Sequence, residues 1–186
     1  MIIEGVDTCG KSTQIELLKK QYPKAIFTKE PGGTPLGVQI RSLVLDGDIK
    51  SKTAELFLFL ADRAEHFSEV IKPNEDNLII SDRGFISGVS YAISFDFEML
   101  IGLNKIALQG CFPDKVIFLK LGEDELLRRL SLKSHDKIES RGIEYLLQIQ
   151  ERIESVICGL GLNALILDAS DKVENINKQI INFLEE

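Results

Sequence analysis

The residues best placed to do chemistry stand near the start of the chain. Gly5 and Gly10 enclose four variable positions and are followed by Lys11-Ser12, which gives the pattern Gly-x-x-x-x-Gly-Lys-Ser. The two glycines let the backbone turn tightly around an anion, so that main-chain N–H groups point at phosphate oxygens. The lysine carries positive charge to the outer phosphates, and the serine hydroxyl offers an oxygen to Mg²⁺. The pattern predicts a nucleotide-binding loop formed by Gly5, Asp7, Thr8, Cys9, Gly10, Lys11, Ser12 and Thr13.

A second candidate group follows the apolar run Leu78-Ile79-Ile80. Asp82 and Arg83 stand where this run ends. Ligands of open α/β sheets gather at the carboxyl ends of the strands, and the glycine-rich loop also follows a strand-like run. We therefore expect Asp82 to hold Mg²⁺ together with Ser12, and Arg83 to contact a phosphate group.

Alternating apolar runs and helical patterns indicate how these groups are positioned. Short apolar runs of the kind found in buried parallel strands lie at 2–3, 25–28, 78–80, 116–119 and 164–167. Helical patterns lie between and after them, at 14–20, 34–45, 53–71, 97–108, 124–132, 143–157 and 173–184. This alternation predicts an α/β fold with a five-stranded parallel sheet, right-handed crossovers and helices on both faces. The length of 186 residues predicts one domain, 1–186.

The stretch between Ser131 and Ser140 is polar and only weakly periodic. We expect it to be the mobile part of the chain, a short lid at about 131–141.

Composition excludes several classes of protein. The formal charge of −7 argues against general nucleic-acid binding, and no apolar run approaches the length of a membrane span. Met1 leads directly into the first predicted strand, which leaves no room for a signal peptide. Three widely spaced cysteines predict reduced thiols rather than a disulfide framework or a zinc site. We therefore expect a cytoplasmic protein with no membrane partner.

Longer stretches of the sequence resemble the bacterial thymidylate kinases. The most specific is Phe-Thr-Lys-Glu-Pro-Gly-Gly-Thr at 27–34, and the resemblance continues through 40–43, 54–63 and Phe112-Pro113-Asp114, so that it covers nearly the whole chain. It implies a P-loop kinase fold and transfer of the γ-phosphoryl group of ATP to thymidine monophosphate, with Mg²⁺. It also implies a homodimer.

The resemblance implies roles for particular residues. Arg41 and Arg83 match positions that contact the acceptor, Phe59 matches an aromatic residue that stacks on thymine, and Arg63 matches one that bonds the edge of the base. Tyr91 matches an aromatic residue that crowds the ribose 2′ position. The complete acceptor site expected is Asp7, Glu30, Arg41, Phe59, Arg63, Arg83, Ser87, Gly88 and Tyr91. From its pattern alone, Phe59 could equally belong to the core of an apolar helix.

The expected catalytic cations come partly from the lid. The variable positions of the glycine-rich loop are Val6 to Cys9, so that Lys11 is the loop's basic side chain. One branch of the family carries the further cation in the lid, and the region here holds Arg128, Arg129, Lys133, Lys137 and Arg141. The resemblance therefore implies a catalytic set of Asp7, Lys11, Arg83, Arg129, Lys137 and Arg141.

Two other functions remain open from the residues. Another small-molecule kinase would share the loop and Asp82, because fold does not fix the substrate. A guanine-nucleotide switch is the weaker alternative, because Asn104-Lys105-Ile106-Ala107 lacks the aspartate of the guanine-reading pattern. His66 and His135 have no partners at metal-ligand spacing and are expected at the surface or in the lid. Lys120 ends a predicted strand where bacterial relatives often have aspartate.

Overall fold

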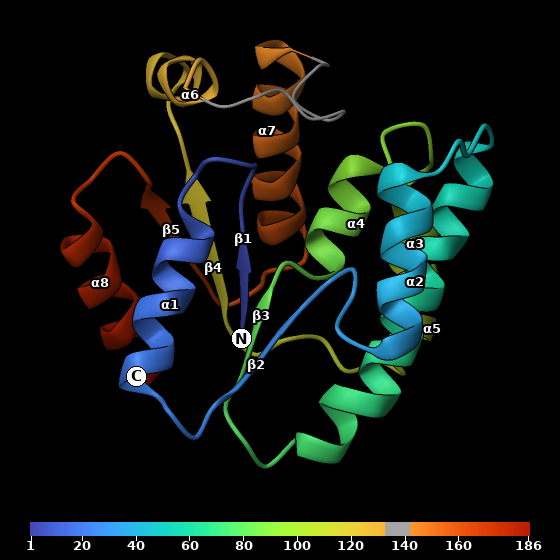
Figure 1. Ribbon diagram of the computed structural model, residues 1–186, viewed down its shortest axis with the longest axis horizontal. Helices are drawn as coiled ribbons and strands as arrows, with labels where there is room; N and C mark the ends of the chain where they lie inside the picture. The colour runs from blue at the N-terminus through green and yellow to red at the C-terminus, as the bar shows by residue number, and fades with distance from the viewer. Residues whose placement is uncertain (133–141) are drawn as a thin grey trace.

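The computed structural model describes residues 1–132 and 142–186 and contains a parallel β-sheet at its centre (Figure 1). Five strands pair in the order β2-β3-β1-β4-β5, and every neighbouring pair is parallel. The strands are β1 (Ile2–Glu4), β2 (Ile26–Lys29), β3 (Ile79–Asp82), β4 (Val116–Lys120) and β5 (Ala164–Asp168). The predicted α/β fold and its five parallel strands are confirmed.

Both faces of the central strands are buried. Ile2, Ile3 and Glu4 of β1 are all buried, and the first four residues of β4 are 0% exposed. Successive side chains of a strand point to opposite faces, so this pattern requires a layer of helices on each side. This is why both strands appear in the sequence as short, continuous apolar runs.

The helices between the strands confirm most of the predicted segments. They are α1 (Lys11–Gln21), α2 (Pro35–Asp46), α3 (Lys52–His66), α4 (Phe85–Tyr91), α5 (Phe97–Ala107), α6 (Glu123–Leu130), α7 (Ile143–Gly159) and α8 (Val173–Glu185). Helices α1 and α8 lie side by side, as do α4 and α7, while α2, α3 and α5 gather beyond the β2 edge (Figure 1). The expected N-cap is present at Thr34, whose hydroxyl accepts a hydrogen bond from the Gly37 N–H at 2.9 Å.

Two details differ from the sequence prediction. The helix expected at 53–71 leaves α geometry after His66 and continues as a π-helical turn over Phe67–Ile71. Helix α4 was not predicted at all. In the described part of the chain, no helix is both long enough and apolar enough to cross a membrane.

The register of the sheet places three loops at one edge. Ile3 and Lys29 both pair with Asp82, so β1, β2 and β3 end at the same level. The Arg83 N–H donates to the Ile3 carbonyl and the Glu30 N–H donates to the Asp82 carbonyl, both at 3.0 Å. The glycine-rich loop, the loop that begins at Glu30 and the turn at Asp82 are thereby brought together.

Candidate active site

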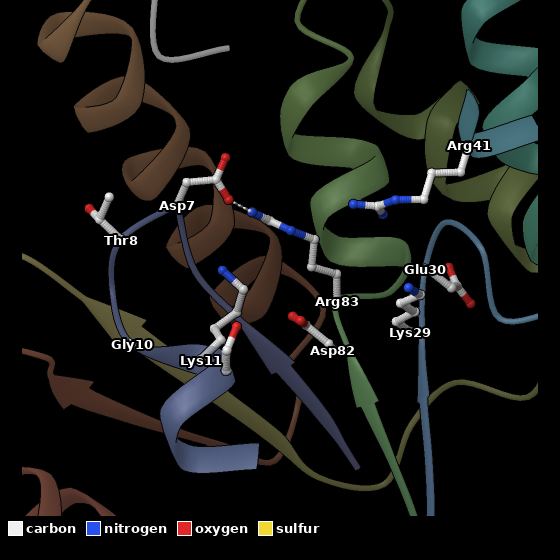
Figure 2. Close-up of a pocket in the computed structure, with 10 residues that line it drawn as sticks. Asp7, Thr8, Gly10, Lys11, Lys29, Glu30, Arg41, Asp82 and Arg83 are labelled. Carbon is white, nitrogen blue, oxygen red and sulfur yellow. Dashed lines mark hydrogen bonds and ion pairs between the residues drawn. The ribbon is translucent and has the colours of Figure 1, made fainter. Parts of the chain in front are cut away.

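A pocket of about 390 Å³ lies at this edge of the sheet (Figure 2). Its lining comes from the three loops and from α1 and α2: Asp7, Thr8, Gly10, Lys11, Ser12, Lys29, Glu30, Arg41, Asp82 and Arg83. Four of these side chains are cationic and three are anionic. Such a lining suits a phosphate-bearing ligand that also needs a divalent cation.

The glycine-rich loop wraps closely around its own lysine. Lys11 Nζ donates hydrogen bonds to the carbonyls of Gly5, at 2.9 Å, and Val6, at 3.0 Å. Gly5 has a φ of 152°, and a Cβ there would lie 2.5 Å from Cys9 Sγ and 2.7 Å from the Leu119 carbonyl oxygen. Only glycine fits this position. The ammonium group of Lys11 is consequently fixed at the centre of the loop, where outer phosphates are expected.

Asp82 fits the expected metal role. Its Oδ1 atom is buried, and among the described residues no side chain or backbone group forms a hydrogen bond with it. A buried carboxylate oxygen without a donor is costly unless a cation or water accompanies it. Ser12 lines the same pocket. A carboxylate and a hydroxyl across a small pocket are the oxygen donors that Mg²⁺ prefers, so these two residues could hold it.

Arg83 is held in the pocket by the glycine-rich loop. Its Nη2 donates to Asp7 Oδ1 at 2.6 Å, the contact drawn as a dashed line in Figure 2, and its Nη1 donates to the Gly5 carbonyl at 2.8 Å. Burial alone would lower the pKa of Arg83, but Tyr91 and the carboxylates of Asp7, Glu4 and Asp82 outweigh it and raise the pKa. Arg83 is therefore a permanent, oriented cation.

Arg41 reaches the pocket from α2. Its Nη1 donates to the Pro31 carbonyl at 3.0 Å, and its guanidinium extends toward Arg83 in Figure 2. Two arginines that approach one point from different elements form a site suited to an anion.

Glu30 contributes to the pocket wall, but its carboxylate faces the helices. Glu30 Oε2 accepts from Arg63 Nε at 2.8 Å. Arg63, which is 3% exposed, also donates to Asn104 Oδ1 at 2.7 Å and to the Gly84 carbonyl at 3.1 Å. Burial alone would raise the pKa of Glu30, but the charge of Arg63 and the hydrogen bond with His66 lower it below its ordinary value. Glu30 is therefore an ionised carboxylate.

The remaining expected acceptor residues surround this pocket on α3 and α4. Phe59 is half-buried on α3. Gly88 packs against the Arg63 guanidinium, because a Cβ there would lie 2.8 Å from Nη1. Ser87 is turned inward, where its hydroxyl donates to the Glu4 carboxylate and accepts from Arg83 Nη1 at 3.2 Å. The Tyr91 ring lies 5.7 Å from the Arg83 guanidinium, and burial raises the pKa of Tyr91 to about 12.

Of the expected lid cations, the structure describes Arg129 at the edge of the glycine-rich loop. Its Nη1 donates to the Thr8 carbonyl at 3.1 Å and its Nη2 donates to the Ala169 carbonyl at 2.8 Å. Lys133, Lys137 and Arg141 lie outside the described residues, as do His135 and most of the lid expected at 131–141.

Sequence reasoning was wrong about His66 and missed two other residues. His66 is not at the surface but 0% exposed, with its ring between Thr28 and Glu30. Lys29 lines the pocket, and its place directly before Glu30 at the end of β2 could have revealed it. Glu4 is fully buried and accepts from the N–H groups of Gly84 and Ser87. The sequence feature that could have identified Glu4 is a carboxylate at the end of an apolar strand.

Lys120 now has a physical explanation. Its ammonium group pairs with Glu154 of α7 at 2.6 Å. This partly exposed ion pair joins the end of β4 to α7.

A parallel sheet with a Gly-x-x-x-x-Gly-Lys-Ser loop after β1 and Asp82 on the adjacent β3 defines a P-loop kinase. The thymidylate kinase family model matches residues 3–180. Thymidylate kinases of Wolinella succinogenes and Aliarcobacter butzleri are 58% and 54% identical to this chain, over 97% and 98% of it and over 95% and 96% of their own lengths. The chain belongs to the thymidylate kinase family.

A solved structure shows the same fold. The thymidylate kinase of Ehrlichia chaffeensis superimposes with a TM-score of 0.77 at 22% identity, with coverage of 100% of this chain and 97% of that one. The resemblance seen in the sequence is thereby confirmed at the level of family and fold.

Proposed function

We infer that the chain transfers the γ-phosphoryl group of ATP to thymidine monophosphate, giving thymidine diphosphate and ADP. The family match over nearly the whole length carries this inference. The geometry supports it, because Lys11 of the glycine-rich loop shares one pocket with Arg41 and Arg83. The acceptor is itself a phosphate, which brings its own nucleophilic oxygen, so cations that offset repulsion matter more than a strong general base.

Each side of the pocket has its own task in this proposal. Lys11 and the backbone N–H groups from Gly5 to Thr13 bind the phosphates of ATP. Arg41 and Arg83 hold the phosphate of the acceptor, and Asp7 fixes the orientation of Arg83 through their ion pair. Lys29 adds a further cation to the same wall.

We propose Mg²⁺ as the metal, held by Ser12 and Asp82. The buried, unpartnered Oδ1 of Asp82 is the observation that favours it. When bound, Mg²⁺ supplies positive charge that offsets the negative charge on the transferring phosphoryl group.

A coupled assay of ADP release with ATP, Mg²⁺ and a panel of nucleoside monophosphates tests the function. We expect the highest kcat/KM with thymidine monophosphate. A higher kcat/KM with a purine nucleotide would favour the alternative, a different nucleoside monophosphate kinase on the same fold.

Phe59→Ala tests the proposed base site. Stacking of a base on an aromatic ring is worth roughly 1–3 kcal/mol. The KM for thymidine monophosphate should therefore rise by the factor that corresponds to this loss of binding free energy, while the KM for ATP stays constant. Ile106→Ala is the control, because Ile106 is 75% exposed on α5 and is not among the residues that line the pocket. An unchanged acceptor KM in Phe59→Ala would return Phe59 to a packing role.

We also propose a homodimer that forms through α2 and α3. These helices pack side by side and carry large apolar side chains that remain exposed, namely Leu36 and Leu43 on α2 and Phe57 on α3. Leu36 and Leu43 are seven residues apart and so share one face of α2. A face of this kind on neighbouring helices is typical of a protein interface.

Phe57→Glu should convert the dimer to a monomer at micromolar concentration in sedimentation velocity, because it replaces an exposed apolar side chain of α3 with a charge that an interface would have to bury. Val173→Glu is the control, since Val173 is also exposed but lies on α8, far from α2 and α3 in Figure 1. If the wild-type chain sediments as a monomer, the dimer proposal is wrong.

We propose a cytoplasmic location, with small nucleotides rather than nucleic acid or membrane as partners. All three cysteines are free thiols, which suits a reducing compartment. The net charge of −7 would repel a nucleic-acid backbone outside the local cations of the pocket.

A further inference from the structure

The His66 ring links α3 to the loop that forms one wall of the pocket. His66 is the last residue of α3 and is fully buried. Its Nδ1 lies 2.9 Å from Glu30 Oε1, and its Nε2 lies 2.6 Å from Thr28 Oγ1. Thr28 belongs to β2 and Glu30 follows the end of that strand, so one ring ties both positions to the helix.

Hydrogen-bonding capacity assigns the proton on Nδ1. Glu30 Oε2 already accepts from Arg63 Nε, and an ionised carboxylate can only accept. The hydrogen between His66 and Glu30 must therefore lie on Nδ1. In a neutral ring Nε2 is then an acceptor, and the Thr28 hydroxyl donates to it. Each carboxylate oxygen of Glu30 thus has its own donor, one from His66 and one from Arg63.

Close packing holds the ring in this orientation. A Cβ at Gly33 would lie 2.6 Å from His66 Cδ2, so the ring lies against the Gly33 backbone. One turn earlier on α3, Asp62 accepts from the Gly32 N–H at 2.9 Å. Helix α3 therefore holds the 30–33 loop at two points, and Glu30 has little freedom to move.

We propose that His66 is a positioning residue for base selection. It fixes the carboxylate of Glu30 through Nδ1, and Glu30 in turn orients the Arg63 guanidinium toward the pyrimidine of the acceptor. This proposal rests on the proposed function and on the family resemblance, which implies that Arg63 bonds the edge of the base. Arg63 donates three of its five N–H groups to Glu30, Asn104 and Gly84, and the other two have no partner among the described residues.

An oriented guanidinium selects for a carbonyl acceptor. Arginine only donates, so it favours a base with a carbonyl oxygen at position 4 over one with an amino group there. A site built to form a hydrogen bond discriminates strongly, because its buried donor is left unpaired by the wrong ligand. Loss of the His66 contact should therefore reduce the preference for thymidine monophosphate over deoxycytidine monophosphate.

Two substitutions separate this role from simple packing. The amide nitrogen of asparagine can occupy the position of Nδ1, whereas the amide of glutamine reaches the position of Nε2 and leaves Glu30 without its donor. In His66→Gln, we expect the ratio of kcat/KM for thymidine monophosphate to that for deoxycytidine monophosphate to fall at least about tenfold. In His66→Asn, the ratio should stay within about threefold of wild type. The KM for ATP should be constant in both variants.

A ratio that is intact in His66→Gln, or one that falls equally in both variants, would overturn the proposal. If His66→Gln does not fold, Glu30→Gln supplies the second measurement, because it weakens the same contacts without altering the ring. Its ratio should also fall, and an unchanged ratio there would likewise contradict the proposal. The proposed function fails separately, if the wild-type chain does not phosphorylate thymidine monophosphate.

Discussion

Lys11→Met is expected to lower kcat by about 10³-fold or more, on the scale of the loss of a positioned charge that stabilises a transition state. Lys11 is 7% exposed, and its Nζ donates to the carbonyls of Gly5 and Val6. A charge fixed in advance at the outer phosphates stabilises the transferring group without reorganisation during the reaction. Methionine keeps the length and apolar stem of the side chain but removes the charge.

Single-turnover and steady-state rates with ATP and thymidine monophosphate provide the measurement. Lys19→Met is the matched control, because Lys19 lies on the same helix and is exposed in a pair with Glu16 at 2.7 Å. Its kcat should equal that of wild type within about twofold, since exposed ion pairs contribute little. A Lys11→Met enzyme that retains more than a tenth of wild-type kcat would contradict the assigned role.

The sequence predicted those parts of the molecule that depend on neighbours in the chain. The glycine-rich loop is contiguous, so residue type and spacing alone identify it. Buried parallel strands such as β4 are continuous apolar runs because helices cover both faces. The closeness of Asp82 to the loop also followed, because the carboxyl ends of parallel strands meet at one edge.

Helix α4 was missed because distant residues stabilise it. At its N-terminal end, the N–H groups of Gly84 and Ser87 donate to the Glu4 carboxylate of β1. Near its other end, Arg152 of α7 donates to the Ser90 carbonyl at 2.8 Å. Helix α4 itself spans seven residues and includes Gly88 and Val89, which are poor helix formers. Tertiary contacts therefore outweigh local preference in this segment.

His66 shows the same limit for a single side chain. Its partners Thr28 and Glu30 are 38 and 36 residues away in sequence. A histidine on a helix carries no local sign of such a partner, and metal-ligand spacing gives no information about a hydrogen bond to a distant carboxylate. The buried network around Glu30 becomes visible only once β2 and α3 are placed together.

The second large loss of kcat is expected when Arg129 is replaced. Its guanidinium joins the Thr8 carbonyl of the glycine-rich loop to the Ala169 carbonyl after β5, and its Nε donates to Glu125 at 2.6 Å. Hydrogen bonds from Arg128 and Arg129 lower the pKa of Glu125 to about 2, so this carboxylate stays ionised and holds Arg129 across the neutral range. A cation at this edge of the loop can offset charge on the transferring phosphoryl group.

Arg129→Ala should lower kcat at least about a hundredfold with little change in the KM for thymidine monophosphate, as expected for a contact made mainly in the transition state. Arg128→Ala is the matched control. Arg128 is the adjacent residue and pairs with the same carboxylate, but 62% of its side chain is exposed. Its kcat should stay within about threefold of wild type.

Whether the substitution changes kcat or the KM for ATP decides which role Arg129 has. If Arg129→Ala raises the KM for ATP and leaves kcat unchanged, the guanidinium binds or shapes the nucleotide site without acting in the transition state. Alanine at Lys137 and at Arg141 completes the series, because the resemblance assigns these residues to the same task. If none of the three alanine variants lowers kcat by more than about threefold, too little for a catalytic cation, the charge is supplied from within the described pocket. Lys29 would then be the first residue to test, because it is a further cation in the lining of the pocket.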